Sequence, residues 1–164
     1  MGTIAVQLAK SQDVNVEVTG VDTAEKFEMM RRIGFDHVID YTKEDFTHNG
    51  LSYDLIIDTK TTRSAFEFPR SLNPGGTYAT VGGIAIKKLL VILLVGWWIR
   101  LTTGKTVRII AMRANRDLPY LSEAFEAGRL VPVIDGHYTL DTARDAFRHY
   151  AAGHQQGKVV ITID

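Results

Sequence analysis

The feature that most constrains the fold is the alternation of short apolar strand patterns with helix patterns along the chain. Apolar residues recur every three or four positions over 3–11 and 23–33, which predicts helices. The apolar runs at 16–21, 37–41 and 53–58 predict strands. Strands that alternate with helices form parallel sheets with right-handed crossovers. The expected fold class is therefore α/β, with a Rossmann-like, doubly wound parallel sheet.

The same alternation continues to the end of the chain. The run "YDLIID" at 53–58 is nearly continuous in apolar residues, as in a sheet that is covered on both faces. We expect a helix around 63–72, a turn at "NPGG", a strand at 77–82, a helix over 84–101, a strand at 106–112 and a helix over 118–128. In the tail, the apolar pattern predicts a helix followed by a strand at 158–163. The residues of this helix expected to face inward are Ala143, Ala146, Phe147 and Tyr150.

Composition narrows the functional classes. The chain has 164 residues, 45% hydrophobic and 23% charged, which is the mix of an ordinary globular domain. Its formal net charge is zero, so there is no general attraction to nucleic acid. The absence of cysteine excludes disulfides and thiol nucleophiles and fits a reducing compartment. No signal-peptide pattern opens the sequence, and we expect a cytoplasmic protein without a nucleic-acid partner.

The segment 84–101 is the most apolar part of the chain. Its uncharged core from Leu89 to Ile99 has 11 residues, whereas a membrane span needs about 20. We therefore expect no membrane span and interpret the segment as a buried or interface helix. A helix lying on a membrane surface, with Lys87, Lys88 and Arg100 at the headgroups, is the alternative.

One acidic residue stands directly after a predicted strand, in "GVDTAEK" at 20–26. An acid at this position binds the ribose hydroxyls in dinucleotide-binding folds, which makes Asp22 a candidate. Asp22 is also well placed to be a helix N-cap. The ribose role requires a glycine-rich phosphate loop about 20 residues upstream, yet the upstream sequence opens with "MGTIAVQLAK".

Six motifs in order resolve this conflict through a resemblance. They are "GTIAVQLAK", "VTGVDTAEK", "GFDHVIDYTKEDF", "YDLIIDT", "LNPGGTYATVGG" and "GHQQGKVVITID". Together they resemble the medium-chain dehydrogenase/reductase superfamily, and most of all its quinone-oxidoreductase-like, zinc-type alcohol dehydrogenase-like branch. The resemblance implies that the chain enters the NAD(P)-binding domain within the phosphate loop, without the first strand. Residues 1–134 would be this domain, and 135–164 would resemble the segment that returns to a GroES-like catalytic domain.

The resemblance also implies which residues bind the cofactor. Gly2 resembles the last glycine of the phosphate loop, where helix and pyrophosphate meet, although a terminal residue is prone to fraying. Asp22 would favour NAD because it repels a 2′-phosphate. Lys26 and Tyr41 resemble residues that hold the 2′-phosphate of NADPH, although a helix-surface lysine is often only solvated. Gly82 and Gly83 resemble backbone that approaches the nicotinamide, or else form a simple turn.

The expected function is the cofactor-binding portion of an NAD(P)-dependent oxidoreductase that acts on a quinone, enone, alcohol or aldehyde. In the family, proton donors and any zinc ligands come mainly from the other domain. We therefore name no catalytic residue, expect no metal in this chain, and expect the chain alone to be inactive. The intact enzyme would bind a small-molecule substrate and form a homo-oligomer.

Two other functions remain open. An S-adenosylmethionine-dependent methyltransferase also fits "YDLIID" followed by "LNPGGTY", with Asp22 on the ribose of that cofactor. A non-enzymatic Rossmann-like interaction module, or an inactive fragment, fits the missing first strand. The histidines give no support to a metal site, because His149 and His154 are five residues apart and not at the i, i+4 spacing of a helical pair.

Overall fold

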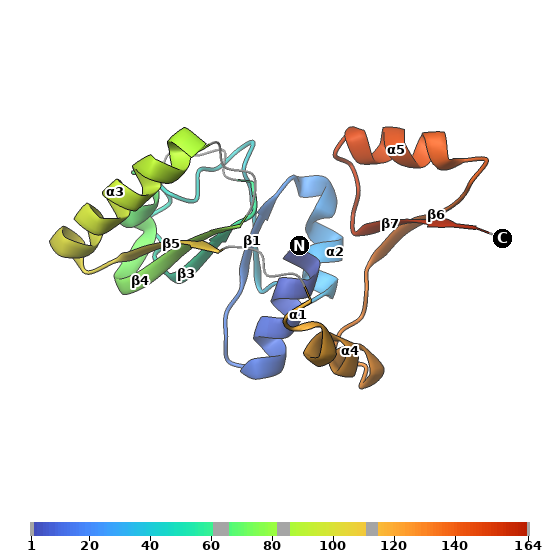
Figure 1. Cartoon of the computed structure of the whole chain (residues 1–164), viewed down its shortest axis with the longest axis horizontal. Coiled ribbons are helices and arrows are strands. Elements are labelled where there is room, and N and C mark those ends of the chain that lie inside the picture. Colours follow the sequence, from blue (N-terminus) through green and yellow to red (C-terminus); the bar gives the residue numbers. More distant parts are fainter. Residues whose placement is uncertain (1, 61–65, 82–85, 111–114, 164) are drawn as a thin grey trace. The chain divides into compact units, whose positions relative to one another are not determined.

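The computed structural model describes residues 2–60, 66–81, 86–110 and 115–163, with the backbone alone over 86–93. The chain divides into two compact units (Figure 1). The first unit contains Met1–Asp40 and Asp117–Asp164, and the second contains Tyr41–Arg116. The described strands form three parallel sheets, in the orders β1-β2, β3-β4-β5 and β6-β7. The predicted α/β class with parallel sheets is confirmed.

The N-terminal part of the first unit is an alternation of helices and two paired strands. Its elements are α1 (Gly2–Gln12), β1 (Thr19–Asp22), the 3₁₀ helix η1 (Ala24–Lys26), α2 (Phe27–Arg32) and β2 (His37–Asp40). The strands run in register, with Asp22 opposite Asp40 at their carboxyl ends. The core beneath them is apolar, and Val6, Met30 and Ile39 are buried. The predicted helix over 23–33 is confirmed, except that its first turn is 3₁₀.

The tail of the first unit carries a second pair of strands with a helix over one face. Its elements are α4 (Leu118–Glu126), β6 (Ile134–Thr139), α5 (Ala143–Ala151) and β7 (Lys158–Thr162). Ala146 is buried as predicted, but Phe147 and Tyr150 are 68% and 63% exposed. Both rings turn toward β7 as predicted, but they are not buried, because a sheet of only two strands covers a narrow part of the helix face.

The second unit is a three-stranded sheet with a long helix on it. Its elements are β3 (Tyr53–Asp58), the 3₁₀ helix η2 (Phe68–Ser71), β4 (Leu72–Val81), α3 (Ile86–Thr103) and β5 (Thr106–Ile110). Figure 1 shows α3 running alongside β5. The core is formed by Phe68, Leu72 and Tyr78, whose two rings stack with centroids 3.9 Å apart. The predicted helix over 84–101 is confirmed, with slightly shifted bounds.

Three details of the second unit differ from the predictions. Leu55 and Ile57 are 56% and 48% exposed, so only the Ile56 side of β3 is covered within this unit. The predicted helix around 63–72 is a 3₁₀ turn over the described residues 68–71, and 61–65 lie outside the described residues. The "NPGG" segment, predicted as a turn, lies within β4, and the pairing with β3 shifts its register there. Gly75 has a φ of +78° and so leaves the regular strand conformation.

Within the described part of the chain, no helix is both long enough and apolar enough to cross a membrane.

Candidate functional site

The carboxyl end of β1 carries an ion pair between two of the predicted site residues. Asp22 is the last residue of β1, and its Oδ1 lies 3.1 Å from the Nζ of Lys26. The same Oδ1 accepts a hydrogen bond of 2.9 Å from the backbone amide of Thr23. The Asp22 side chain is 37% exposed, whereas that of Lys26 is 14% exposed. A carboxylate that reaches solvent therefore sits beside a largely covered ammonium.

The local sequence explains this pairing. Thr23 occupies the N-cap position of η1 in an extended conformation without a side-chain capping hydrogen bond, and the Lys26 amide donates to the Thr23 carbonyl at 3.0 Å. This tight turn brings residue i+4 back over residue i, as on a helix surface. The N-cap position that was the alternative for Asp22 is occupied by Thr23, and Asp22 instead accepts the hydrogen bond of the Thr23 amide.

A glycine in β1 allows close packing beneath the site. A Cβ built on Gly20 would lie 2.2 Å from Met30 Cε and 2.7 Å from Phe35 Cδ1. Only a residue without a side chain lets Met30 and Phe35 fill the space below β1. The strand that presents Asp22 is thus fixed from beneath by α2 and by the turn that follows it.

The C-terminal tail also contacts η1, and sequence reasoning did not predict this. Gln156 Nε2 donates to the Glu25 carbonyl at 3.4 Å, and His154 Nδ1 lies 3.5 Å from Glu25 Oε2. The backbone amide of Gln156 donates to Asp135 Oδ2 at 2.7 Å, and His149 Nε2 lies 2.8 Å from the same oxygen. The segment that follows α5 therefore connects Asp135 to the turn that carries Lys26.

These contacts change the titration of one carboxyl group. The pKa of Asp135 is lowered, first by the hydrogen bond with His149 and then by the hydrogen bond from the Gln156 amide. The charge of His149 and, as the smallest cause, that of Lys26 lower this pKa further. No periodic or motif signal in the sequence marks Asp135 or His149, because their pairing depends on how β6 and α5 pack.

Of the other predicted site residues, the structure describes Gly2 and Tyr41. Gly2 is the exposed first residue of α1, and a Cβ there would only touch Phe35 Cζ at 4.0 Å. Tyr41 follows β2, is 54% exposed and belongs to the second unit. Gly82 and Gly83 lie outside the described residues. The structure therefore brings together Asp22 and Lys26 and leaves the roles of the other four as predictions.

A second polar contact, in the other unit, stabilises the carboxyl end of β3. The Tyr78 hydroxyl donates to Asp58 Oδ2 at 2.8 Å, and the Lys60 amide donates to Asp58 Oδ1 at 2.9 Å. Burial, followed by the hydrogen bond and charge of Asp58, raises the pKa of Tyr78. The phenol therefore stays protonated and acts as a structural donor.

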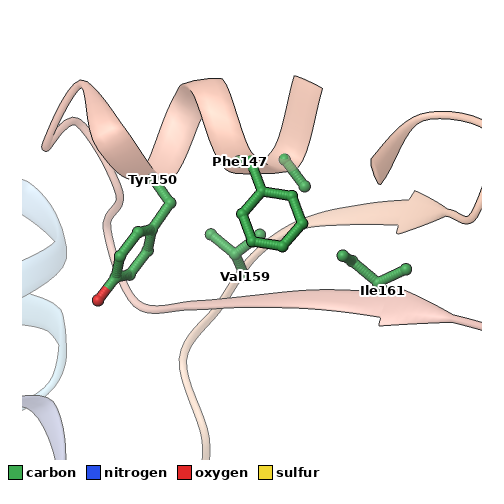
Figure 2. A pocket seen from close by; sticks show the side chains of 5 residues that line it. Phe147, Tyr150, Val159 and Ile161 are labelled. Atoms are coloured by element: carbon green, nitrogen blue, oxygen red, sulfur yellow. The ribbon is translucent and has the colours of Figure 1, made fainter. Parts of the chain in front are cut away.

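An apolar groove of about 210 Å³ lies between α5 and β7, and Figure 2 shows the rings of Phe147 and Tyr150 extending from the helix toward the strand. Ala146, Val159 and Ile161 complete its lining. The groove presents no carboxylate or cation that would bind ribose or phosphate, so it does not qualify as the cofactor site. Within the described ranges, no three or more His, Cys, Asp or Glu side chains gather in a way that would hold a metal ion.

The Asp22 carboxylate and the Lys26 ammonium at the end of β1 suit the adenosine end of a dinucleotide. A partly exposed carboxylate suits the ribose hydroxyls, and an ammonium beside it suits a 2′-phosphate. The start of α1 offers backbone amides, which suit a pyrophosphate.

Comparisons with known proteins show what the chain as a whole is similar to. A sequence model described as zinc-binding dehydrogenase matches residues 33–161. The chain is 28% identical to a 2-methylene-furan-3-one reductase of Solanum lycopersicum, over 98% of the chain and 37% of that protein. It is also 28% identical to an NADPH-dependent alkenal/one oxidoreductase, chloroplastic, of Arabidopsis thaliana, with the same two coverages.

The fold agrees with that of a solved structure, the quinone oxidoreductase from Coxiella burnetii. The TM-score is 0.78 at 20% identity, covering 98% of this chain and 49% of that one. The chain spans less than half the length of each of these similar proteins.

Proposed function

Because the chain belongs to the zinc-binding dehydrogenase family, within the medium-chain dehydrogenase/reductase superfamily, we propose that it is the cofactor-binding portion of an NAD(P)-dependent oxidoreductase. The observation that carries this proposal is the Asp22–Lys26 pair at the carboxyl end of β1. As their names state, the similar reductases act on a furanone and on alkenals or enones. Our proposed substrate is accordingly a small quinone, enone, alcohol or aldehyde.

In this proposal, the cofactor and the residues of the chain have separate roles. The nicotinamide supplies hydride chemistry when it is bound, and the residues of this chain hold and orient it. Asp22 accepts hydrogen bonds from the ribose hydroxyls and repels a 2′-phosphate, whereas Lys26 attracts one. Gly2 starts the helix whose first amides face the pyrophosphate. Tyr41 is proposed to contact the 2′-phosphate, and Gly82 and Gly83 the nicotinamide.

Catalysis is proposed to need residues beyond this portion. Among the described residues, no three or more His, Cys, Asp or Glu side chains gather to hold a metal ion. We therefore expect the 164-residue chain alone to show little or no turnover, and we propose that 135–164 contributes to the catalytic domain of the intact enzyme. A cytoplasmic location remains part of the proposal.

We also propose that the protein is a homo-oligomer that associates through α3. The side chains of Leu94, Trp97, Trp98 and Leu101 are each more than half exposed. Their spacing of i, i+3, i+4 and i+7 places them on one face of the helix. An apolar stripe containing two tryptophans is unusual on the surface of a monomer, and a second copy of the same helix would cover it.

The proposal is tested by titrating the purified chain with NADH and with NADPH. Asp22→Ser is expected to shift preference toward NADPH, because it removes the repulsion of the 2′-phosphate. Lys26→Ala is expected to weaken NADPH binding more than NADH binding, by about 1 kcal/mol for a charge-assisted contact. Arg129→Ala, which breaks an exposed ion pair with Glu123 in the same unit, is the matched control.

The same titration separates the alternatives. Equal effects of both variants on both cofactors would show that neither residue reads the 2′ position. A chain that binds neither dinucleotide would favour the non-enzymatic module. The methyltransferase alternative, which the family assignment does not support, requires binding of S-adenosylmethionine, and we expect none.

A further inference from the structure

We propose that Asp135, on the tail, is a specificity-determining residue of the dinucleotide site. Gln156 links Asp135 to the turn that carries Lys26. Asp135 thereby adds a carboxylate to the electrostatic surroundings of Lys26, which weakens the attraction of this ammonium for a 2′-phosphate. This inference rests on the proposed function, because it assumes that a dinucleotide binds at the end of β1. It goes beyond that function by assigning part of the cofactor choice to the returning tail.

The geometry depends on one bridging residue. The backbone amide of Gln156 donates to Asp135 Oδ2 at 2.7 Å, and the side-chain amide of Gln156 donates to the Glu25 carbonyl at 3.4 Å. Glu25 directly precedes Lys26 in η1. His149 Nε2, at 2.8 Å, fixes the same Asp135 oxygen from α5. Asp135 is therefore anchored from two sides and lies near the turn.

The electrostatics support the geometry. The Lys26 charge is one of the causes that lower the pKa of Asp135, after the hydrogen bonds from His149 and Gln156. The Asp135 side chain is 26% exposed and that of Lys26 is 14% exposed, so water screens their attraction less than at an open surface. The other charged or titratable groups near Asp135 and this turn are Asp22, Glu25, His149 and His154.

The charge balance decides which cofactor is favoured. Asp22, Glu25 and Asp135 are three carboxylates beside the one ammonium of Lys26, so with the histidines neutral the turn carries two net negative charges. A phosphate group must approach against this charge, whereas a ribose hydroxyl is uncharged and can donate to a carboxylate. Removing the Asp135 charge therefore favours NADPH and leaves NADH binding nearly unchanged.

The test compares dissociation constants for both cofactors on the full chain and on Asp135→Asn. We expect the variant to bind NADPH about threefold tighter or more, with NADH changed less than about twofold and with the difference shrinking as salt is added. Asp135→Glu keeps the charge and should restore the original ratio. The control is Asp145→Asn, since Asp145 is an exposed tail carboxylate whose partner is Arg148, at 3.0 Å.

A measurement without cofactor tests the geometry separately. The pKa of Asp135, followed by carboxyl-carbon NMR, should be below the usual value of 3.8 and should rise in Lys26→Ala. An unchanged pKa in that variant would overturn the inference even if Asp135→Asn failed to fold. Binding of dinucleotides with an unchanged NADPH-to-NADH ratio in Asp135→Asn would overturn the inference alone. A chain that binds neither cofactor would overturn the proposed function as well.

Discussion

Substituting Gly20 by alanine tests whether the space beneath β1 is as full as the structure indicates. The added Cβ would lie 2.2 Å from Met30 Cε, 2.7 Å from Phe35 Cδ1 and 2.8 Å from Phe35 Cε1. The methionine end is flexible and can move, but the Phe35 ring must move as well. Overpacking of a filled core costs about 1–3 kcal/mol, and because two side chains must move we expect about 2 kcal/mol of lost unfolding free energy.

Urea denaturation followed by circular dichroism measures this loss. A double-mutant cycle with Met30→Ala isolates its cause, because the smaller side chain removes the closest contact. The double variant should then be more stable than the sum of the two single losses predicts. Gly2→Ala is the control, since its Cβ would meet Phe35 only at 4.0 Å. A loss below about 0.5 kcal/mol for Gly20→Ala, or strict additivity in the cycle, would refute the reasoning.

Three further predictions concern stability and assembly. Phe68→Ala should lower the unfolding free energy by about 3–5 kcal/mol, because Phe68 is 1% exposed and stacks on Tyr78. Urea denaturation measures this loss, and a loss under about 1 kcal/mol would contradict the prediction. The pKa of Asp36 is lowered by Lys10, so Asp36 stabilises the fold above pH 3.8 and loses this effect as the pH falls through its lowered pKa. The Asp36→Asn variant should therefore be less stable than the parent at pH 7 but not in acid. An equal stability difference at both pH values would be contrary evidence. Trp97→Gln should reduce self-association in sedimentation without any liposome binding, and a monomeric parent chain that partitions into liposomes would disprove the interface.

The sequence predicted the elements well where hydrophobic periodicity decides structure. The helix over 3–11 and the strand at 53–58 are nearly as expected, because each pattern repeats over several residues. The prediction failed around 63–72 over the described residues. Pro69 stands at the start of a 3₁₀ turn there and lacks the amide that an α-helix interior would use.

The candidate site likewise contains residues that the local sequence predicts and contacts that depend on how distant segments pack. Asp22 could be predicted because an acid follows a predicted strand, and Lys26 because its motif resembles that of the family. Their ion pair at i, i+4 comes from the structure. The contact from Gln156 to Glu25 spans 131 residues, so it depends on how the tail packs and no local pattern indicates it. Exposure of Phe147 was also beyond the sequence, since the same periodicity describes a buried face and a face that lines an open groove.

The central claim is that a nicotinamide dinucleotide binds at the carboxyl end of β1, and amide NMR tests it most directly. The Thr23 amide donates to Asp22 Oδ1, so its chemical shift reports on that carboxylate. Adding NADH should shift the Thr23 and Lys26 amides saturably, with the Asp145 amide on α5 unchanged. Saturable binding that moves other amides but leaves Thr23 and Lys26 in place would contradict the account, as would the absence of any shift with either NADH or NADPH.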